Sequence, residues 1–355
     1  VSSKYLGEGL IINRIIVDND TLDISNESRD IISGSTNMIV TLEQPLAPNK
    51  ISSINVKWQF KIPKIWKIRM GNYGEGNFFI AYWYPQISVY DDIDGWDMIN
   101  YEGSVEFYND FSNYDVNIKV PGGFVTWATG ELQNGKEVLR EDIYKKYEQA
   151  KKSDETIRII TAEDYKYGLV TSENEKNIWH FKAENVTDFS FALSKSFNWD
   201  GASVVVDESN GRRALADVAY ENGTVNYDKA AQYARASVEY LSKELPGFPY
   251  PYSHVTSFCN GSRGGGMESP MMANNGAPID IASHVGLIFH EISHNYFPFM
   301  MGTNERKYAW MDEGWAAFYP TEIVDRYSPH YDYLSNRVRN YERNAGNESE
   351  LPPIT

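Results

Sequence analysis

Hydrophobic residues change their spacing once along this chain of 355 residues, and that change limits how the chain can fold. In the first part apolar and polar residues alternate, as over Ile54–Ile62, which predicts a strand with one buried face. After about residue 200 the apolar spacing becomes helical, as over Ala230–Leu245. Because 355 residues are too many for one ordinary core, we predict two domains, a β-rich one over 1–200 and another over 201–355.

The same two patterns predict the other elements. We expect a helix over Leu139–Tyr147, a second over Ser283–Phe297 that Pro298 ends, and a third over Met311–Tyr319. Short apolar runs predict further strands at Gly9–Val17, Met38–Leu42, Val116–Val120, Ile178–Phe181 and Ser203–Val206. The fold class that follows is α+β.

The composition excludes several classes of protein. The net charge is −16 and the pI is near 4.9, so the chain is a poor candidate for binding nucleic acid or an anionic membrane. The sequence has no apolar stretch of the roughly 18 residues that a membrane span requires. The one cysteine, Cys259, allows no internal disulfide. Hydrophobic residues at 42% and charged residues at 23% are typical of a globular protein.

The expected helix Ser283–Phe297 contains the H-E-x-x-H motif, from His290 through Glu291 to His294. Four residues make just over one helical turn, so both imidazoles project from one face and can bind one metal ion. Two imidazoles with a carboxylate suit zinc. Glu291 lies beside the two histidines, where its carboxylate can act as a base. Taken alone, so short a motif can also arise by chance in an ordinary helix.

Glu313 supplies a candidate third ligand, with eighteen residues between it and His294. A second helix that crosses the first would bring this carboxylate to the two histidines. Glu313 is flanked by Trp310, Met311, Trp315 and Phe318, and an unpaired charge in an apolar setting is costly. A metal ion would compensate that cost, whereas a solvated helix carboxylate would need no partner.

The loop Gly264-Gly265-Gly266-Met267-Glu268 precedes the motif. Consecutive glycines let a backbone approach a neighbouring chain closely, so this segment could pair with the main chain of a peptide. Glu268 would then present one carboxylate at the end of that edge. A flexible loop with a solvated glutamate gives the same sequence pattern.

Together these elements resemble the aminopeptidase N family of gluzincin zinc metallopeptidases, in its bacterial branch. Members of that family have a G-x-M-E-N loop, then H-E-x-x-H, then a glutamate ligand in an N-E-G-F-A context. The matching segments here are Gly265–Ser269, His290–His294 and Asp312–Ala316, with further likeness at Trp83–Pro85, Val89–Asp92, Gly95-Trp96, Ala128–Asn134, Trp179–Val186 and Asp188-Phe189. The resemblance thus covers nearly the whole chain.

The resemblance implies a β-rich saddle domain followed by a thermolysin-like zinc peptidase domain. It implies that Glu268 holds the free α-amine of the substrate and that Met267 lines the pocket for the first side chain. Gly265 and Gly266 would bind the peptide main chain through backbone groups. Ser269 and Asp312 depart from the family pattern, which has asparagine at both positions.

Two further features of the family are not matched. Members often add an acid or amide from the N-terminal domain to hold the amine, and Ala81–Tyr84, where it is expected, contains neither. Members also carry a tyrosine that stabilises the oxyanion several tens of residues beyond the third ligand. Only 42 residues follow Glu313, and none of the tyrosines among them has the family context. We therefore expect that tyrosine beyond residue 355 and a peptidase domain that is incomplete at its C-terminal end.

The function that follows is an aminopeptidase with one zinc per chain, Glu291 as general base and peptides with a free N-terminus as substrates. The alternatives are an endopeptidase with the same zinc site, a silent scaffold on the same fold and a hydrolase of small non-peptide substrates. The chain begins at Val1 and not at a methionine, which fits a removed signal peptide. We expect an exported or periplasmic bacterial protein, although a cytoplasmic location fits the sequence too. The oligomeric state is open.

Overall fold

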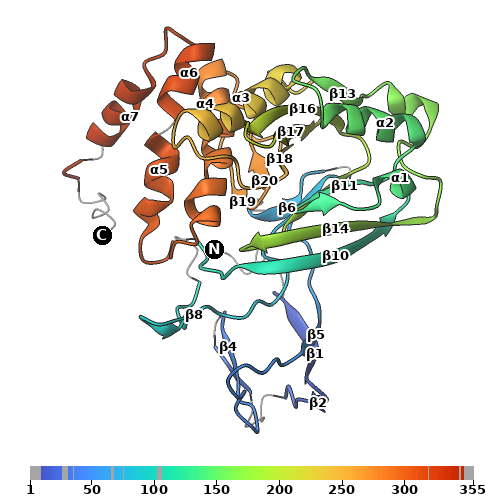
Figure 1. Ribbon diagram of the computed structural model, residues 1–355, viewed down its shortest axis with the longest axis vertical. Helices are drawn as coiled ribbons and strands as arrows, with labels where there is room; N and C mark the ends of the chain where they lie inside the picture. Colours follow the sequence, from blue (N-terminus) through green and yellow to red (C-terminus); the bar gives the residue numbers. More distant parts are fainter. Residues whose placement is uncertain are drawn as a thin grey trace.

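The computed structural model describes residues 9–25, 31–34, 36–64, 68–74, 76–101, 106–318, 320–343 and 345–347. Strands dominate the first half and helices the last third, so the expected mixture of α and β structure with a β-rich N-terminal part is confirmed (Figure 1). In Figure 1 the first strands lie below and most helices lie above. The long strands β10 (Ser112–Pro121) and β14 (Lys176–Val186) lie between them. Within the described residues, no helix has both the length and the apolar character to cross a membrane.

The first strands form a small sheet with its own cluster of buried residues. β1 (Ile11–Val17) pairs antiparallel with β2 (Asp20–Thr21) and β5 (Ile54–Gln59). In β5 the side chains of Val56 and Trp58 are half-buried between exposed neighbours, as predicted. Ile54 is 48% exposed, however, and the strand ends at Gln59 and not at Ile62. Two hairpins complete this region, β3 (Ile31–Ser33) with β4 (Met38–Val40) and β8 (Tyr90–Asp91) with β9 (Gly95–Trp96).

Two further sheets share a large core with a pair of short helices. One sheet contains β10 (Ser112–Pro121), β14 (Lys176–Val186) and β12 (Glu131–Leu132); the other contains β11 (Val125–Ala128), β15 (Phe191–Ser194), β7 (Phe78–Ile80) and β6 (Met70–Asn72). The helix expected over Leu139–Tyr147 is two helices, α1 (Gly135–Val138) and α2 (Glu141–Ala150). The break at Leu139 and Arg140, whose backbones are extended, separates them.

A six-stranded mixed sheet carries the predicted site. Its order is β13 (Ile157–Ile160), β16 (Asn198–Asp207), β17 (Arg212–Tyr220), β18 (His254–Cys259), β20 (Met272–Asn275) and β19 (Glu268–Ser269). β17, β18 and β20 run parallel, whereas β19 returns antiparallel to β20 and ends the sheet. The predicted boundary near residue 200 lies inside β16, and the division into two domains stays a prediction.

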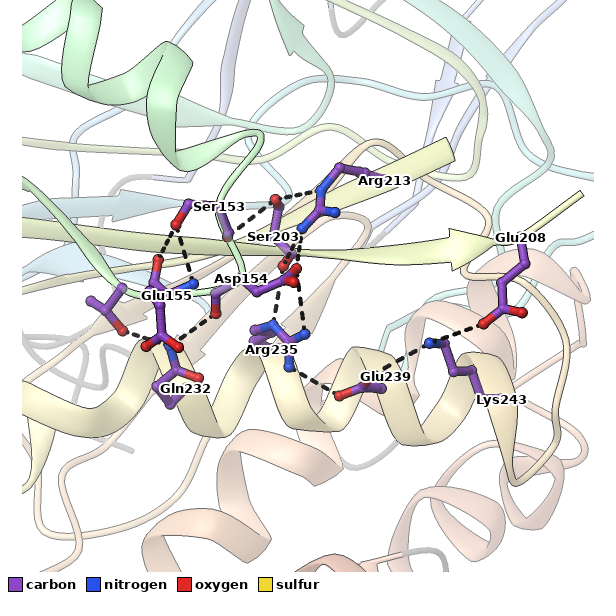
Figure 2. A network of polar contacts seen from close by, with 11 residues as sticks. Ser153, Asp154, Glu155, Ser203, Glu208, Arg213, Gln232, Arg235, Glu239 and Lys243 are labelled. Atoms are coloured by element: carbon purple, nitrogen blue, oxygen red, sulfur yellow. Dashed lines mark hydrogen bonds and ion pairs between the residues drawn. The ribbon is translucent and has the colours of Figure 1, made fainter. Parts of the chain in front are cut away.

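Helix α3 (Ala230–Lys243) covers β16 and β17, after a 3-10 turn at Tyr227–Lys229. Figure 2 shows the hydrogen bonds and ion pairs that connect the loop before β13 to this helix. Asp154 in the loop pairs with Arg213 of β17 and, at 3.6 Å, with Arg235 of α3. Arg235 also pairs with Glu239 one turn later, at 3.0 Å. Such ion pairs near the surface each contribute less than about 1 kcal/mol to the free energy of unfolding. Their main effect is to hold the loop in position against α3.

Helix α4 (Ile281–Ser293) carries the H-E-x-x-H motif and begins at Asp280, whose side chain accepts a hydrogen bond from the Ser283 N–H at 2.8 Å. The predicted end at Phe297 is wrong, because the α-helix stops at Ser293 and a π-helical segment follows over Asn295–Met300. Pro298 explains this result. Its ring would clash with the carbonyl of residue 294 in a regular helix, and it forces Phe297 into an extended backbone.

Three short helices close the structure: α5 (Glu313–Phe318), α6 (Pro320–Tyr327) and α7 (Tyr333–Glu342). A 3-10 turn over Ala309–Met311 precedes α5, so the helix expected over Met311–Tyr319 begins two residues later, and Tyr319 lies outside the described residues. α4 packs against α3, α5 and α6. Gly286 of α4 permits the close approach of Tyr333, whose ring would lie 3.1 Å from a Cβ at this position.

We predict that Phe289→Ala lowers the free energy of unfolding by about 3–5 kcal/mol. Phe289 lies in α4 next to His290, is fully buried and packs edge-on against Tyr240 of α3. Its removal leaves a cavity between the two helices. Urea denaturation followed by circular dichroism measures the effect, and a loss below about 1 kcal/mol would contradict this account of how α4 is held.

Candidate active site

The two histidines of the motif lie side by side at the end of α4. His290 is in the last turn and His294 is the first residue after the helix. Their Nε2 atoms are 3.2 Å apart and their ring centroids 4.7 Å apart. Two nitrogens bound to one tetrahedral zinc at about 2.05 Å would be about 3.3 Å apart. The pair therefore has the spacing that one metal ion requires.

Glu313, the first residue of α5, reaches the same point. Its Oε2 lies 3.4 Å from His290 Nε2, and one ligand atom from each of His290, His294 and Glu313 lies within 4.8 Å of the others. The crossing of α4 by α5 thus brings the three predicted ligands together. The expected apolar enclosure of Glu313 is not found, because its side chain is 50% exposed and the flanking Trp310 and Trp315 are exposed as well.

Asp312 holds His294 in place, a role that the sequence did not reveal. Both side chains are buried, and Asp312 Oδ1 hydrogen-bonds to His294 Nδ1. Burial alone would lower the pKa of His294, but the Asp312 carboxylate outweighs burial and raises that pKa well above its ordinary value. The contact keeps the proton on Nδ1 and turns Nε2 towards His290. An acid directly before the candidate ligand Glu313 is the only signal that could have suggested it.

Glu291 is buried between the motif and the glycine loop. One atom from each of Glu268, Glu291 and His294 lies within 4.8 Å of the others. Burial raises the pKa of Glu291 well above its ordinary value, and the carboxylate of Glu268 raises it further. A Cβ on Gly266 would stand 2.1 Å from Glu291 Oε1, so only glycine lets the loop pass this carboxylate.

The glycine loop lies along the end of the six-stranded sheet. The Gly276 N–H donates to the carbonyl of Gly265 at 2.9 Å, and Met267 and Asn274 exchange backbone hydrogen bonds. β19 continues this edge. Among the described residues no strand pairs with its outer side, so backbone groups there can pair with an extended peptide. The close approach of this backbone to a peptide substrate, and its pairing with that peptide, stay predictions.

Residues from the N-terminal part reach Met267, which is buried. The Arg69 guanidinium lies 3.2 Å from its sulfur and makes a two-pronged ion pair with Glu106. Arg69 also stacks over the rings of Tyr82 and Tyr101, at 5.6 Å and 5.4 Å from their centroids. No sequence feature indicated this cluster, because 198 residues separate Arg69 from Met267.

A small pocket, with room for about one water-sized group, adjoins Glu268. Its wall contains Tyr82, Phe107, Asp188, Glu268, Thr303 and Glu305. Tyr82 has a positive φ of 52°, which costs a bulky residue about 1 kcal/mol or more. It belongs to Ala81–Tyr84, where the family resemblance places an amine-holding group, so this segment does reach the site but presents a phenol.

Comparison with solved structures places this fold among known ones. The M1 zinc metallopeptidase from Deinococcus radiodurans aligns over 98% of this chain and 67% of its own, with 13% identity and a TM-score of 0.59. The overall fold is therefore shared with an M1 zinc metallopeptidase. A mutant of that enzyme bound to a Tyr-Ser-Ala substrate covers 95% of this chain at a TM-score of 0.57, with 14% identity and 66% of its own length. A two-domain M1 mutant bound to L-arginine gives 13% identity, a TM-score of 0.56, and coverage of 95% and 65%.

No protein-family model matches the chain, and no curated protein matches it by sequence. At identities of 13–14%, these alignments show a likeness of fold alone. The chemistry has to be argued from the residues of the site. The chain spans about two thirds of the M1 metallopeptidases that it matches.

Two of the tyrosines after Glu313, Tyr333 and Tyr327, have structural partners. The Tyr333 hydroxyl accepts hydrogen bonds from Arg337, the nearer at 2.9 Å, and its ring is buried against α4. The ring of Tyr327 packs on Tyr233 of α3, with centroids 4.8 Å apart. An oxyanion-stabilising tyrosine beyond residue 355 stays a prediction.

We predict that Asp188→Asn stabilises the protein at pH 7 and not at pH 4. Burial raises the pKa of Asp188 from 3.8 to about 6, so the folded wild type loses stability as the pH rises from about 4 to about 6. Asparagine keeps the acceptor oxygen used by Tyr84, Gln86 and the Phe189 N–H but carries no charge. The gain at pH 7 should reach up to about 3 kcal/mol. Urea unfolding at both pH values tests this, and an equal effect at both would contradict it.

Proposed function

We propose that this protein is a zinc metallopeptidase in which His290, His294 and Glu313 hold one zinc ion per chain. The observation that carries the proposal is the 3.2 Å approach of the two Nε2 atoms with the Glu313 carboxylate beside them. Imidazole nitrogens and a carboxylate oxygen are the donors that a catalytic zinc takes from a protein, with one position left for water. The fold shared with M1 zinc metallopeptidases supports the proposal.

Zinc in such a site supplies Lewis acidity, which lowers the pKa of water and polarises a carbonyl. Glu291 serves as the general base. Its carboxylate lies next to the ligands without being one of them, takes a proton from the attacking water and returns it to the departing amine. The burial that raises the pKa of Glu291 makes it a stronger proton acceptor than an exposed glutamate. Asp312 keeps the imidazole of His294 in the tautomer that turns Nε2 to the metal.

We infer that the peptidase is an aminopeptidase. Glu268 is buried beside Glu291, at the end of the sheet edge along which a peptide would lie. A buried anion there attracts an α-ammonium and leaves no room for further residues on its N-terminal side. Gly265 and Gly266 would bind the peptide main chain and Met267 would line the pocket for the first side chain. Solved M1 metallopeptidases with Tyr-Ser-Ala or L-arginine bound are consistent with this assignment.

The finer fold assignment belongs with this proposal. The N-terminal strands would form the saddle domain of the aminopeptidase N family and the residues after about 200 its thermolysin-like domain. Endopeptidase activity from the same zinc site is the competing function. It needs no group that reads the α-amine, so Glu268 separates the two. A silent scaffold is disfavoured because the base and all candidate ligands are present and lie together.

Metal analysis tests the zinc site directly. We predict about one equivalent of zinc in the dialysed wild type and in Glu291→Gln, and less than a tenth of an equivalent in His294→Ala. Turnover of peptides should fall about 10²–10⁴-fold in Glu291→Gln, because only the base is lost. Retention of zinc by His294→Ala, or near-normal turnover by Glu291→Gln, would contradict the assigned roles.

A free and an N-acetylated leucine reporter test the exopeptidase assignment. We predict that Glu268→Gln lowers kcat/KM for the free-amine reporter by about 10- to 100-fold, since glutamine lacks the negative charge that pairs with the ammonium group. Hydrolysis of the acetylated reporter should be weak and should not change further. Zinc content serves as the control for both proteins. Equal losses on the two reporters would show that Glu268 does not recognise the amine.

A further inference from the structure

Three carboxyl groups, those of Glu268, Glu305 and Asp312, lie together next to the proposed metal site. One oxygen from each of Glu268, Glu305 and Asp312 lies within 4.8 Å of the others, and all three side chains are buried. Like charges at this separation in a dry site repel strongly, so the arrangement favours a bound cation.

The wall of the adjoining cavity gives an independent indication of a ligand. Asp188 lies on this wall and is almost completely buried. Its Oδ1 accepts three hydrogen bonds, whereas its Oδ2 has no partner among the described residues. The Thr303 hydroxyl on the same wall also has no partner within that part of the chain. Buried polar atoms without partners are rare in folded proteins and commonly mark a ligand or ion.

The cationic side chains nearest to the cluster are already engaged. Arg69 uses both terminal nitrogens on Glu106, which neutralises its charge. His294 donates Nδ1 to Asp312 and turns its other nitrogen to the proposed metal. Among the described residues, no further lysine or arginine pairs with Glu268 or Glu305. Within the described residues, therefore, the cluster has no lysine or arginine of its own to balance its charge.

We propose that Glu305, with Glu268 and Asp312, binds the α-ammonium group of the substrate. This inference rests on the proposed aminopeptidase function and adds a residue to it. Glu305 lies between the motif helix and Glu313, in a segment to which neither the spacing nor the family resemblance gives a role. It takes the place of the acid or amide that Ala81–Tyr84 does not provide.

The chemistry of the cluster suits an ammonium group. An ammonium group has three N–H donors, and the cluster presents one buried oxygen from each of three side chains within 4.8 Å of one another. A calcium ion would instead take six to eight oxygens at about 2.4 Å.

The location also fits the reaction. Glu268 belongs to this cluster and to the cluster with Glu291 and His294, so it joins the ammonium site to the proposed metal site. The first carbonyl carbon of a peptide is two bonds from its α-nitrogen. A nitrogen held by Glu268 and Glu305 therefore places the first peptide bond, and not a later one, next to Glu291.

Two inhibitors that differ only in the α-amine test the role of Glu305. L-leucine hydroxamate and 4-methylpentanohydroxamic acid have the same side chain and the same zinc-binding group. In the zinc-loaded wild type we expect the amine to improve Kd by about 100-fold, and in Glu305→Gln we expect that ratio to fall by about tenfold or more. Glu305→Asp keeps the charge and should retain more of the ratio than Glu305→Gln.

Glu244→Gln is the matched control, because Glu244 forms an exposed ion pair with Arg326 at 2.7 Å on the surface. It should leave the inhibitor ratio unchanged. Zinc content and melting temperature of each variant show whether the fold and the metal site are intact, and glutamine in place of a buried acid leaves the side-chain volume unchanged.

Each outcome separates the inference from the proposed function. An unchanged ratio in a folded Glu305→Gln that still binds both hydroxamates overturns the inference alone. Binding of one equivalent of calcium that Glu305→Gln abolishes also overturns it, because the cluster would then be a second metal site. Failure of both hydroxamates to bind the zinc-loaded wild type rejects the peptidase function, and the inference with it.

Discussion

The contact between helix α4 and the edge of the six-stranded sheet determines the site. Glu291 on the helix and Gly266 on the loop meet so closely that any side chain at Gly266 would overlap the carboxylate. This contact fixes the distance between the H-E-x-x-H motif and the strand edge along which a peptide would lie. α3, α5 and α6 pack against the other sides of α4, so the helix has a single position. The geometry of the metal ligands and of Glu268 follows from that position.

Charge is the second constraint on the site. Glu268, Glu291, Glu305 and Asp312 are all buried, and their nearest cationic partner is His294. Burying this many carboxyl groups destabilises a fold unless protons or cations compensate them. Two cations would do so in the function proposed here, a zinc ion and the substrate ammonium group. These two cations would offset most of the negative charge of the site.

The N-terminal part completes the site through contacts that are distant in sequence. The Asn274 side chain donates to the carbonyl of Ile68 at 2.7 Å, and the Thr129 hydroxyl donates to the carbonyl of Pro270 at 2.7 Å. Arg69 reaches Met267, and Tyr82 lies on the wall of the cavity beside Glu268. Because these contacts surround the loop that would hold the first residue of a peptide, the N-terminal part shapes the pocket for that residue.

The sequence by itself determined the local features of this protein. The spacing of four residues in the motif places His290 and His294 on one helix face, because the helical period depends only on the backbone. Part of the alternation in β5 and the helical spacing in α3 were confirmed for the same reason. Only the tertiary structure decided the half-exposed position of Glu313 and the contacts of Asp312, Arg69 and Glu305. These depend on which distant segments pack together and how much water they exclude, and no periodicity within one segment contains that information.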